Sequence, residues 1–152
     1  MTPGRRTLRF DNLDEIMPEV DRLVGRSEHL GTWSLAQTCR HLAAVLRRVA
    51  DLPASTPIDK SLWIGEEEKR KVFETGRIPE GLPAPHEVVP ADESLDERAE
   101  AEELRQAIDH YKASPGPAVP HRFFGPLTRD EWNRLQCIHC AHHLSFIVPK
   151  PA

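Results

Sequence analysis

The sequence predicts an all-α protein: a four-helix bundle with a long crossover between the second and third helices and proline-rich loops. Three observations support this prediction. Apolar residues recur at helical spacing in four stretches of the 152 residues. A capping pattern opens each of these stretches. No segment alternates between apolar and polar residues over more than a few positions, so we expect no strands.

The first helix is expected over residues 12–24. Asn12 and Glu15 resemble a capping pair at its start. Pro18 lies inside this stretch, and it either kinks the helix or moves the true start to a later residue. One face of the stretch is apolar and consists of Leu13, Ile16, Met17, Val20, Leu23 and Val24.

The second helix opens with a capping box formed by Ser34 and Gln37, and we expect it to end near Pro53. The third opens with the same pattern at Ser94 and Glu97. Buried faces are expected from Leu35, Cys39, Leu42, Leu46 and Val49 in the second helix, and from Leu95, Leu104, Ile108 and Tyr111 in the third.

The fourth helix opens with a capping box at Thr128 and Glu131 and should reach about Ile147, where two prolines stop it. Between the second and third helices, residues 61–74 have room for a short helix. Prolines then impose an extended course, and a second proline cluster precedes the fourth helix. The chain is expected to be a single domain over residues 1–152. The two clusters are Pro79, Pro83, Pro85 and Pro90, and Pro115, Pro117, Pro120 and Pro126.

Composition excludes several classes of function. Lys and Arg number 20 against 24 Asp and Glu, and the basic residues are scattered, so we expect no nucleic-acid partner. No run approaches the ~18 apolar residues of a membrane span, and no signal peptide follows the start, so we expect no membrane association. The three cysteines do not form a disulfide framework. These features are typical of a cytoplasmic protein with reduced thiols.

Two histidines four residues apart indicate a metal site in the fourth helix. His139 and His143 lie on the inward stripe with Trp132, Leu135 and Phe146. A buried imidazole without a partner costs free energy, and His at i and i+4 can reach one cation together. His139 with His142, at i and i+3, is the alternative pair.

A third ligand would complete the set that catalytic metal sites usually have, with one position left for water or substrate. His41 is the best candidate, because it lies on the flank of the second helix, roughly 100° from the centre of its apolar face. An all-imidazole set suits Zn, Ni, Fe or Mn, so the sequence predicts a divalent metal without selecting one.

The pair Cys137 and Cys140 offers a rival site, because C-x-x-C can bind zinc or act in redox chemistry. A redox pair normally lies at a helix N-terminus, where the dipole lowers the thiol pKa, whereas this pair lies in the middle of a helix. We therefore interpret the two cysteines as small residues on the surface of the helix or between helices.

Three segments together resemble the DinB/YfiT-like superfamily of metal-binding four-helix bundles, and within it a bacterial family of unknown function. The segments run from Trp33 to His41, from His121 to Trp132 and from His139 to Pro149. The resemblance implies that His41, His139 and His143 bind a divalent metal. It also implies relatives that include thiol S-transferases, a mycothiol-dependent isomerase and hydrolases, and pairing as a homodimer.

Two hypotheses about function follow. In the first, the protein is a metal-dependent S-transferase or hydrolase for a small-molecule substrate, with a low-molecular-weight thiol as partner. Gln37 would orient a ligand, His142 would carry protons at the rim, and His121 or Trp33 would line the mouth with the loops near Pro83 and Pro120. In the second, the protein is not catalytic, and the metal is structural or absent. No acidic residue falls on the inward stripe of the fourth helix, with Glu131 at its margin, and this favours thiol chemistry or the second hypothesis.

Overall fold

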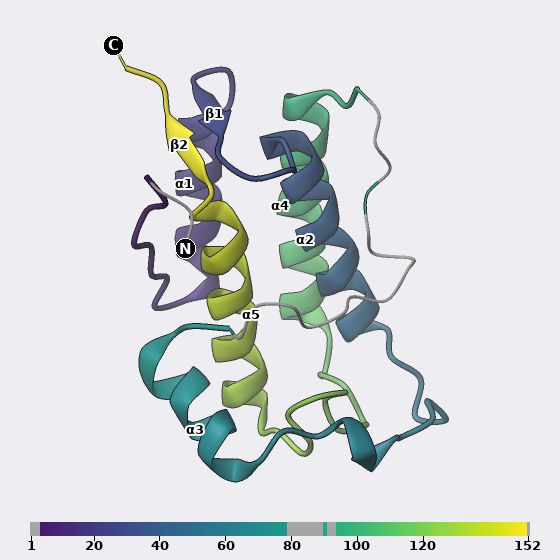
Figure 1. The fold of residues 1–152 in the computed structure, drawn as a ribbon. Helices are drawn as coiled ribbons and strands as arrows, with labels where there is room; N and C mark the ends of the chain where they lie inside the picture. The colour runs from purple at the N-terminus through teal and green to yellow at the C-terminus, as the bar shows by residue number, and fades with distance from the viewer. Residues whose placement is uncertain (1–3, 79–89, 91–93, 152) are drawn as a thin grey trace.

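The computed structural model describes residues 4–78, 90 and 94–151, and this part of the chain is mostly helical. The predicted helical class is therefore confirmed. Figure 1 shows α2 and α4 side by side, and α5 lies next to α1 to the left of this pair. The described helices are α1 (Ile16–Leu23), α2 (Leu35–Ala50), α3 (Glu66–Thr75), α4 (Glu97–Ala113) and α5 (Arg129–Leu144).

The first predicted helix begins later than residue 12. Asn12 does form a capping box with Glu15, but it caps a 3-10 turn, η1 (Leu13–Glu15), that leads into α1. Pro18 then falls in the first turn of α1, where its missing N–H removes no helical hydrogen bond. Two alternatives were predicted for Pro18, a kink or a later start of the helix. The structure has the later start.

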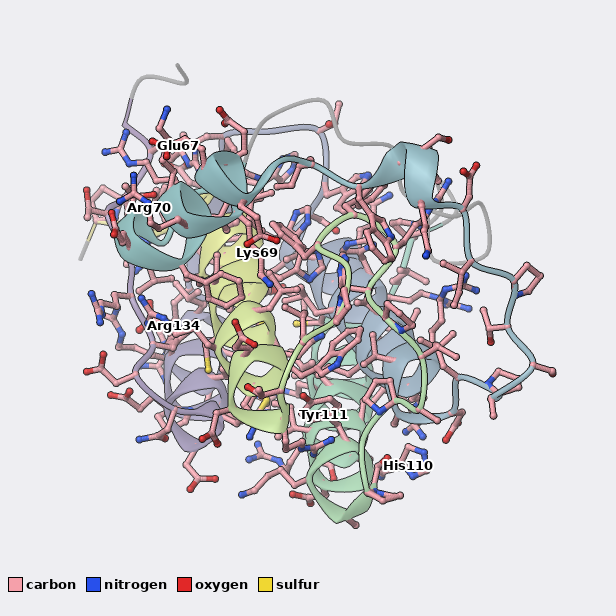
Figure 2. The ribbon with its side chains drawn as sticks, turned by 90° about the horizontal axis from the view of Figure 1, so that it is seen from below. Glu67, Lys69, Arg70, His110, Tyr111 and Arg134 are labelled. Carbon is pink, nitrogen blue, oxygen red and sulfur yellow. The ribbon has the colours of Figure 1, made fainter. Side chains whose placement is uncertain are left out.

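The ends of the later helices also differ from the sequence prediction. Asp96, not Ser94, caps α4, because its side chain accepts a hydrogen bond from the backbone N–H of Ala99. The segment expected around residues 61–74 divides into a 3-10 turn, η2 (Lys60–Leu62), and α3. The outer surface of α3 carries charged side chains, among them Glu67 and Arg70 (Figure 2).

Two short strands contradict the expectation of no strands. β1 (Ser27–His29) pairs antiparallel with β2 (Ile147–Pro149), with Glu28 opposite Val148. This pairing takes the chain out of helical geometry after Leu144, so α5 ends three residues before the predicted Ile147. The small sheet holds the end of α5 next to the loop that leads into α2.

The main core forms where α1, α2, α4 and α5 meet. Its fully buried members include Ile16, Leu23, Leu42, Leu46, Leu104, Tyr111 and Leu144. A second, smaller cluster joins α3 to the other side of α5 through Val72, Phe124, Leu135 and Ile138. No helix in the described ranges combines the length and the apolar character that crossing a membrane requires.

Candidate metal centre

Helix α2 positions the first histidine. Ser34 and Gln37 close the predicted capping box, with the backbone N–H of Ser34 donating to Gln37 Oε1 at 3.0 Å, and this fixes where the helix begins. His41 follows one turn after Gln37 and is only 2% exposed. The side chain is buried because the Trp33 ring lies 4.8 Å from the imidazole and α5 faces it.

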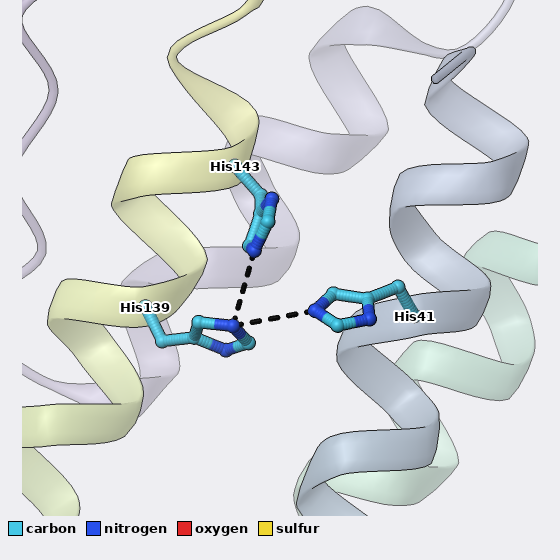
Figure 3. Close-up of side chains that lie close together, drawn as sticks. All are labelled: His41, His139 and His143. Carbon is cyan, nitrogen blue, oxygen red and sulfur yellow. Dashed lines mark hydrogen bonds between the residues drawn. The ribbon is translucent and has the colours of Figure 1, made fainter. Parts of the chain in front are cut away.

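Helix α5 contributes the other two histidines. Thr128 and Glu131 close its capping box as predicted, and the continuous helix places His139 and His143 one turn apart. His139 Nε2 lies 3.3 Å from His41 Nε2 and 3.1 Å from His143 Nε2, and the three rings point toward one another (Figure 3). One ligand atom from each ring lies within 4.8 Å of the other two.

Hydrogen bonding among the rings cannot satisfy this cluster. An imidazole nitrogen carries either one hydrogen or one lone pair, yet His139 Nε2 lies against two other nitrogens. A tetrahedral cation with Zn–N bonds of about 2.0–2.1 Å would hold pairs of nitrogens about 3.3 Å apart. The two shortest separations are close to that value, so the three imidazoles fit a divalent cation.

Burial keeps the two imidazoles of α5 in the form that binds metal. The pKa of His139 is well below its ordinary value, first because the ring is desolvated and then because His143 and His41 lie beside it. The pKa of His143 falls to about 3, again mainly through burial, with smaller contributions from His41, His142 and Arg5. Both rings are therefore neutral at pH 7, with lone pairs available to a cation. Within the described residues, no carboxylate contributes to either pKa shift.

The site has one open side. A pocket of about 240 Å³ reaches His143 and is lined by Gly31, Thr32, Trp33, Thr38, His142, His143 and Phe146. The Trp33 ring stacks on His143 at 5.4 Å, so Trp33 lines the opening as predicted. His142 lies at this rim, where its Nδ1 accepts a hydrogen bond from Arg5 at 3.0 Å. Because a guanidinium only donates, the Nδ1 of His142 carries no hydrogen.

Two glutamines near the histidines differ in their hydrogen bonding. The amide oxygen of Gln37 belongs to the capping box, so its role in orienting a ligand stays a prediction. Gln136, which the sequence analysis missed, is 3% exposed, and its Oε1 has no hydrogen-bond partner among the described residues. Gln136 precedes His139 by three residues and His143 by seven, so helical spacing alone could have placed it on the histidine stripe.

The remaining candidate residues lie outside the histidine cluster. Cys137 and Cys140 are both buried and belong to the main core, which agrees with small residues packed between helices. Burial raises the pKa of Cys137 to about 11. His121 packs 5.3 Å from the Trp132 ring, and burial with nearby Arg122 lowers its pKa to about 4. Pro83 lies outside the described residues, whereas Pro120 lines a separate pocket.

Comparison with known proteins identifies a family and no closer relative. No curated protein and no solved structure matches the chain. A family described as "Protein of unknown function (DUF1569)" matches residues 3–150. Because this match covers nearly the whole sequence, the histidines, the small sheet and the proline-rich approach to α5 all lie inside it. The chain belongs to this family of proteins of unknown function.

Proposed function

We propose that this protein is a DinB/YfiT-like four-helix bundle that binds one divalent cation through His41, His139 and His143. We further propose that it transfers a low-molecular-weight thiol to a small electrophile. The observation that carries the proposal is the convergence of three imidazoles from two helices on one point. The packing of α1, α2, α4 and α5 around the main core supports the bundle, and α3 then belongs to the crossover.

Thiol transfer fits the groups around the site. A bound cation would supply Lewis acidity, which lowers the pKa of a thiol or water that it contacts. Among the described residues, no carboxylate affects the pKa of His139 or His143, so a reaction in which the substrate brings its own nucleophile fits best. The thiol gives up its proton, the sulfur bonds to the electrophilic carbon, and the leaving group departs with the bonding electrons.

Each residue at the opening has a proposed part. Arg5 places positive charge beside His142, which favours a thiolate or a thiol that carries carboxylates. Trp33 covers two imidazole rings and limits the access of water. His142 is the proposed proton carrier. Gln136, with its unpaired amide oxygen, is proposed to accept a hydrogen bond from a group bound at the cation.

Metal analysis tests the site itself. The protein purified from cells is expected to carry about one divalent metal per chain, and His139→Ala should lose most of it. His110→Ala is the matched control, because His110 is exposed and pairs with Asp51 on the surface. Equal metal content in His139→Ala and His110→Ala would rule the site out.

A thiol screen tests the reaction. The metal-loaded protein would be incubated with bacillithiol, mycothiol, glutathione or coenzyme A and a reactive small electrophile. We expect conjugation with one of these thiols that stops after chelation and in His139→Ala. A hydrolase would instead show turnover without any thiol.

A structural role for the metal is the second candidate. It is favoured by the position of the histidines, which join α2 to α5, two helices that pack less extensively on each other than α2 packs on α4. Metal that raises the melting temperature but supports no conjugation or hydrolysis would favour this role.

The homodimer and the cytoplasmic location stay predictions.

A further inference from the structure

A second pocket lies along α2, away from the cluster of His41, His139 and His143. This pocket has a volume of about 340 Å³, within the range of about 300–1,000 Å³ typical of small-molecule sites. Val45 belongs to its wall and follows His41 by one helical turn, about 6 Å along the axis of α2. The wall is largely apolar, with Val45, Val49, Leu62, Trp63, Val119 and Trp132 among its residues.

Backbone hydrogen bonds hold the walls of this pocket in place. His121 and Gly125 exchange two backbone hydrogen bonds, at 2.8 and 3.1 Å, and close a tight turn. Gly125 has φ +70°, and a Cβ there would lie 3.2 Å from the Trp63 ring, so glycine lets the turn pack against the indole. The N–H of Ile64 donates to the carbonyl of Phe123 at 2.9 Å and ties the two segments together.

His121 provides a fixed hydrogen-bond donor in this apolar wall. Its Nδ1 accepts hydrogen bonds from the backbone N–H groups of Phe123 and Phe124, at 2.9 and 3.1 Å. The lone pair of Nδ1 is therefore in use, and the hydrogen of the neutral ring must lie on Nε2. No group in the described ranges accepts a hydrogen bond from this Nε2–H, so a ligand in the pocket can.

The polar groups of the pocket favour an anion. Arg122 lines it and is exposed. Asp59 carries the one carboxylate among the described lining residues, and it already accepts hydrogen bonds from the backbone N–H and the hydroxyl of Ser61. Ile58 and Leu62, the two large hydrophobic residues that are most exposed in the described chain, lie at the same pocket. An apolar body and an acidic head therefore match its lining.

We infer that this pocket is a binding site for a small apolar carboxylate, such as a medium-chain or aryl carboxylic acid. The apolar body would cover Leu62, Trp63 and Val45, and a carboxylate oxygen would accept the hydrogen of His121 Nε2. Arg122 would attract the anion. This site uses none of the three clustered histidines, so it does not depend on the proposed metal chemistry.

Calorimetric titration with octanoate tests the inference, using metal-free and metal-loaded protein. We expect one octanoate per chain in both forms. Leu62→Glu and Leu62→Lys remove the same apolar side chain from a partly exposed position, so neither should prevent folding. Leu62→Glu is expected to weaken octanoate binding at least about tenfold relative to Leu62→Lys, because it places like charge beside the ligand.

Three outcomes would overturn the inference. These are no octanoate binding to the wild type, equal affinity for Leu62→Glu and Leu62→Lys, and equal affinity of the wild type for octanoate and neutral octanamide. Arg77→Gln is the control for net charge, because Arg77 is exposed and is not part of the pocket wall. Octanoate binding that survives chelation would separate this site from the metal centre.

Discussion

Helix α2 carries two stripes of residues, roughly 100° apart, and their side chains have different surroundings. Cys39, Leu42 and Leu46 form one stripe, and each is completely buried in the main core. His41 and Val45 lie on the other, where the first meets two imidazoles from α5 and the second borders a pocket. The first stripe holds the helices together, whereas the second leaves room for polar groups and ligands.

Helix α5 shows the same division. Cys140 and Leu144 are fully buried in the main core. The stripe of Gln136, His139 and His143 contains two of the three clustered histidines and an amide oxygen, Oε1 of Gln136, that has no hydrogen-bond partner among the described residues. Close packing supplies most of the stability of a small domain, so polar groups without ideal partners are tolerated where packing is incomplete. The difference between the two stripes therefore separates residues kept for stability from residues available for function.

Thiol labelling offers the largest contrast between the stripes. Burial, and then Glu100 and Glu97, raise the pKa of Cys39 to about 12. Its thiolate fraction at pH 8 is then on the order of a thousandfold below that of a free cysteine. Iodoacetamide should modify Val45→Cys rapidly at pH 8 and leave Cys39 intact.

The pH dependence provides a check on this contrast. Labelling of Cys39 in the folded protein should rise about tenfold per pH unit below pH 12, because each unit raises the thiolate fraction tenfold. Mass spectrometry of the modified peptides measures both sites in one sample. Equal labelling rates for Cys39 and for the cysteine of Val45→Cys would remove the distinction between the stripes.

Two truncations one residue apart test the same contrast in stability. Leu46→Ala should lower the free energy of unfolding by about 2–5 kcal/mol, because it opens a cavity in a closely packed core. Val45→Ala should cost about 1 kcal/mol or less, because Val45 already borders open space. Urea denaturation measures both. A cost for Val45→Ala as large as that for Leu46→Ala would show that the pocket wall is packed core.

The sequence predicted the elements that local chemistry determines. The capping boxes at Ser34 and Thr128 fixed two helix starts, because these caps act over three residues. The pairing of β1 with β2 could not be predicted, because it joins segments near opposite ends of the chain and each strand has only three residues. Ser94 and Asp96 both precede the third predicted helix, and the pattern chose the wrong one.

The same limit applies to the candidate site. The spacing of His139 and His143 predicted that they would share a face, because helix geometry alone decides it. The deep burial of His41 depends on Trp33 and α5, which no pattern within α2 encodes. The 340 Å³ pocket likewise forms from segments far apart in sequence, so only the folded chain reveals it.

Metal should stabilise the protein only through the stripe of α2 that carries His41. A ligand that binds only the folded state adds about 2.7 kcal/mol at a concentration of 100 times its Kd. Zinc at that excess should raise the free energy of unfolding of the wild type and of Leu46→Ala by similar amounts. His41→Ala should lose this gain. Stabilisation of His41→Ala equal to that of the wild type would place the metal elsewhere.

The last two predictions concern two amides on α5. Gln136 is buried with an unpaired Oε1, so replacing it with the apolar Met of similar length should remove a desolvation cost. We expect Gln136→Met to raise the free energy of unfolding of the metal-free protein by about 1 kcal/mol, measured in urea. A residue that lowers stability is expected where it serves function, so the same variant should slow any thiol conjugation.

Asn133 provides the opposite case on the same helix. Its Oδ1 accepts a hydrogen bond from the hydroxyl of Tyr111 at 2.8 Å, and Tyr111 is fully buried on α4. Asn133→Leu should therefore lower the free energy of unfolding by about 1–2 kcal/mol, because it leaves a buried hydroxyl without a partner. Opposite signs for Gln136→Met and Asn133→Leu would show that the hydrogen bond of Asn133 to α4 stabilises the fold, whereas the unpaired Oε1 of Gln136 on the histidine stripe destabilises it. A loss of stability in Gln136→Met as large as that in Asn133→Leu would mean that Gln136 holds the helices together.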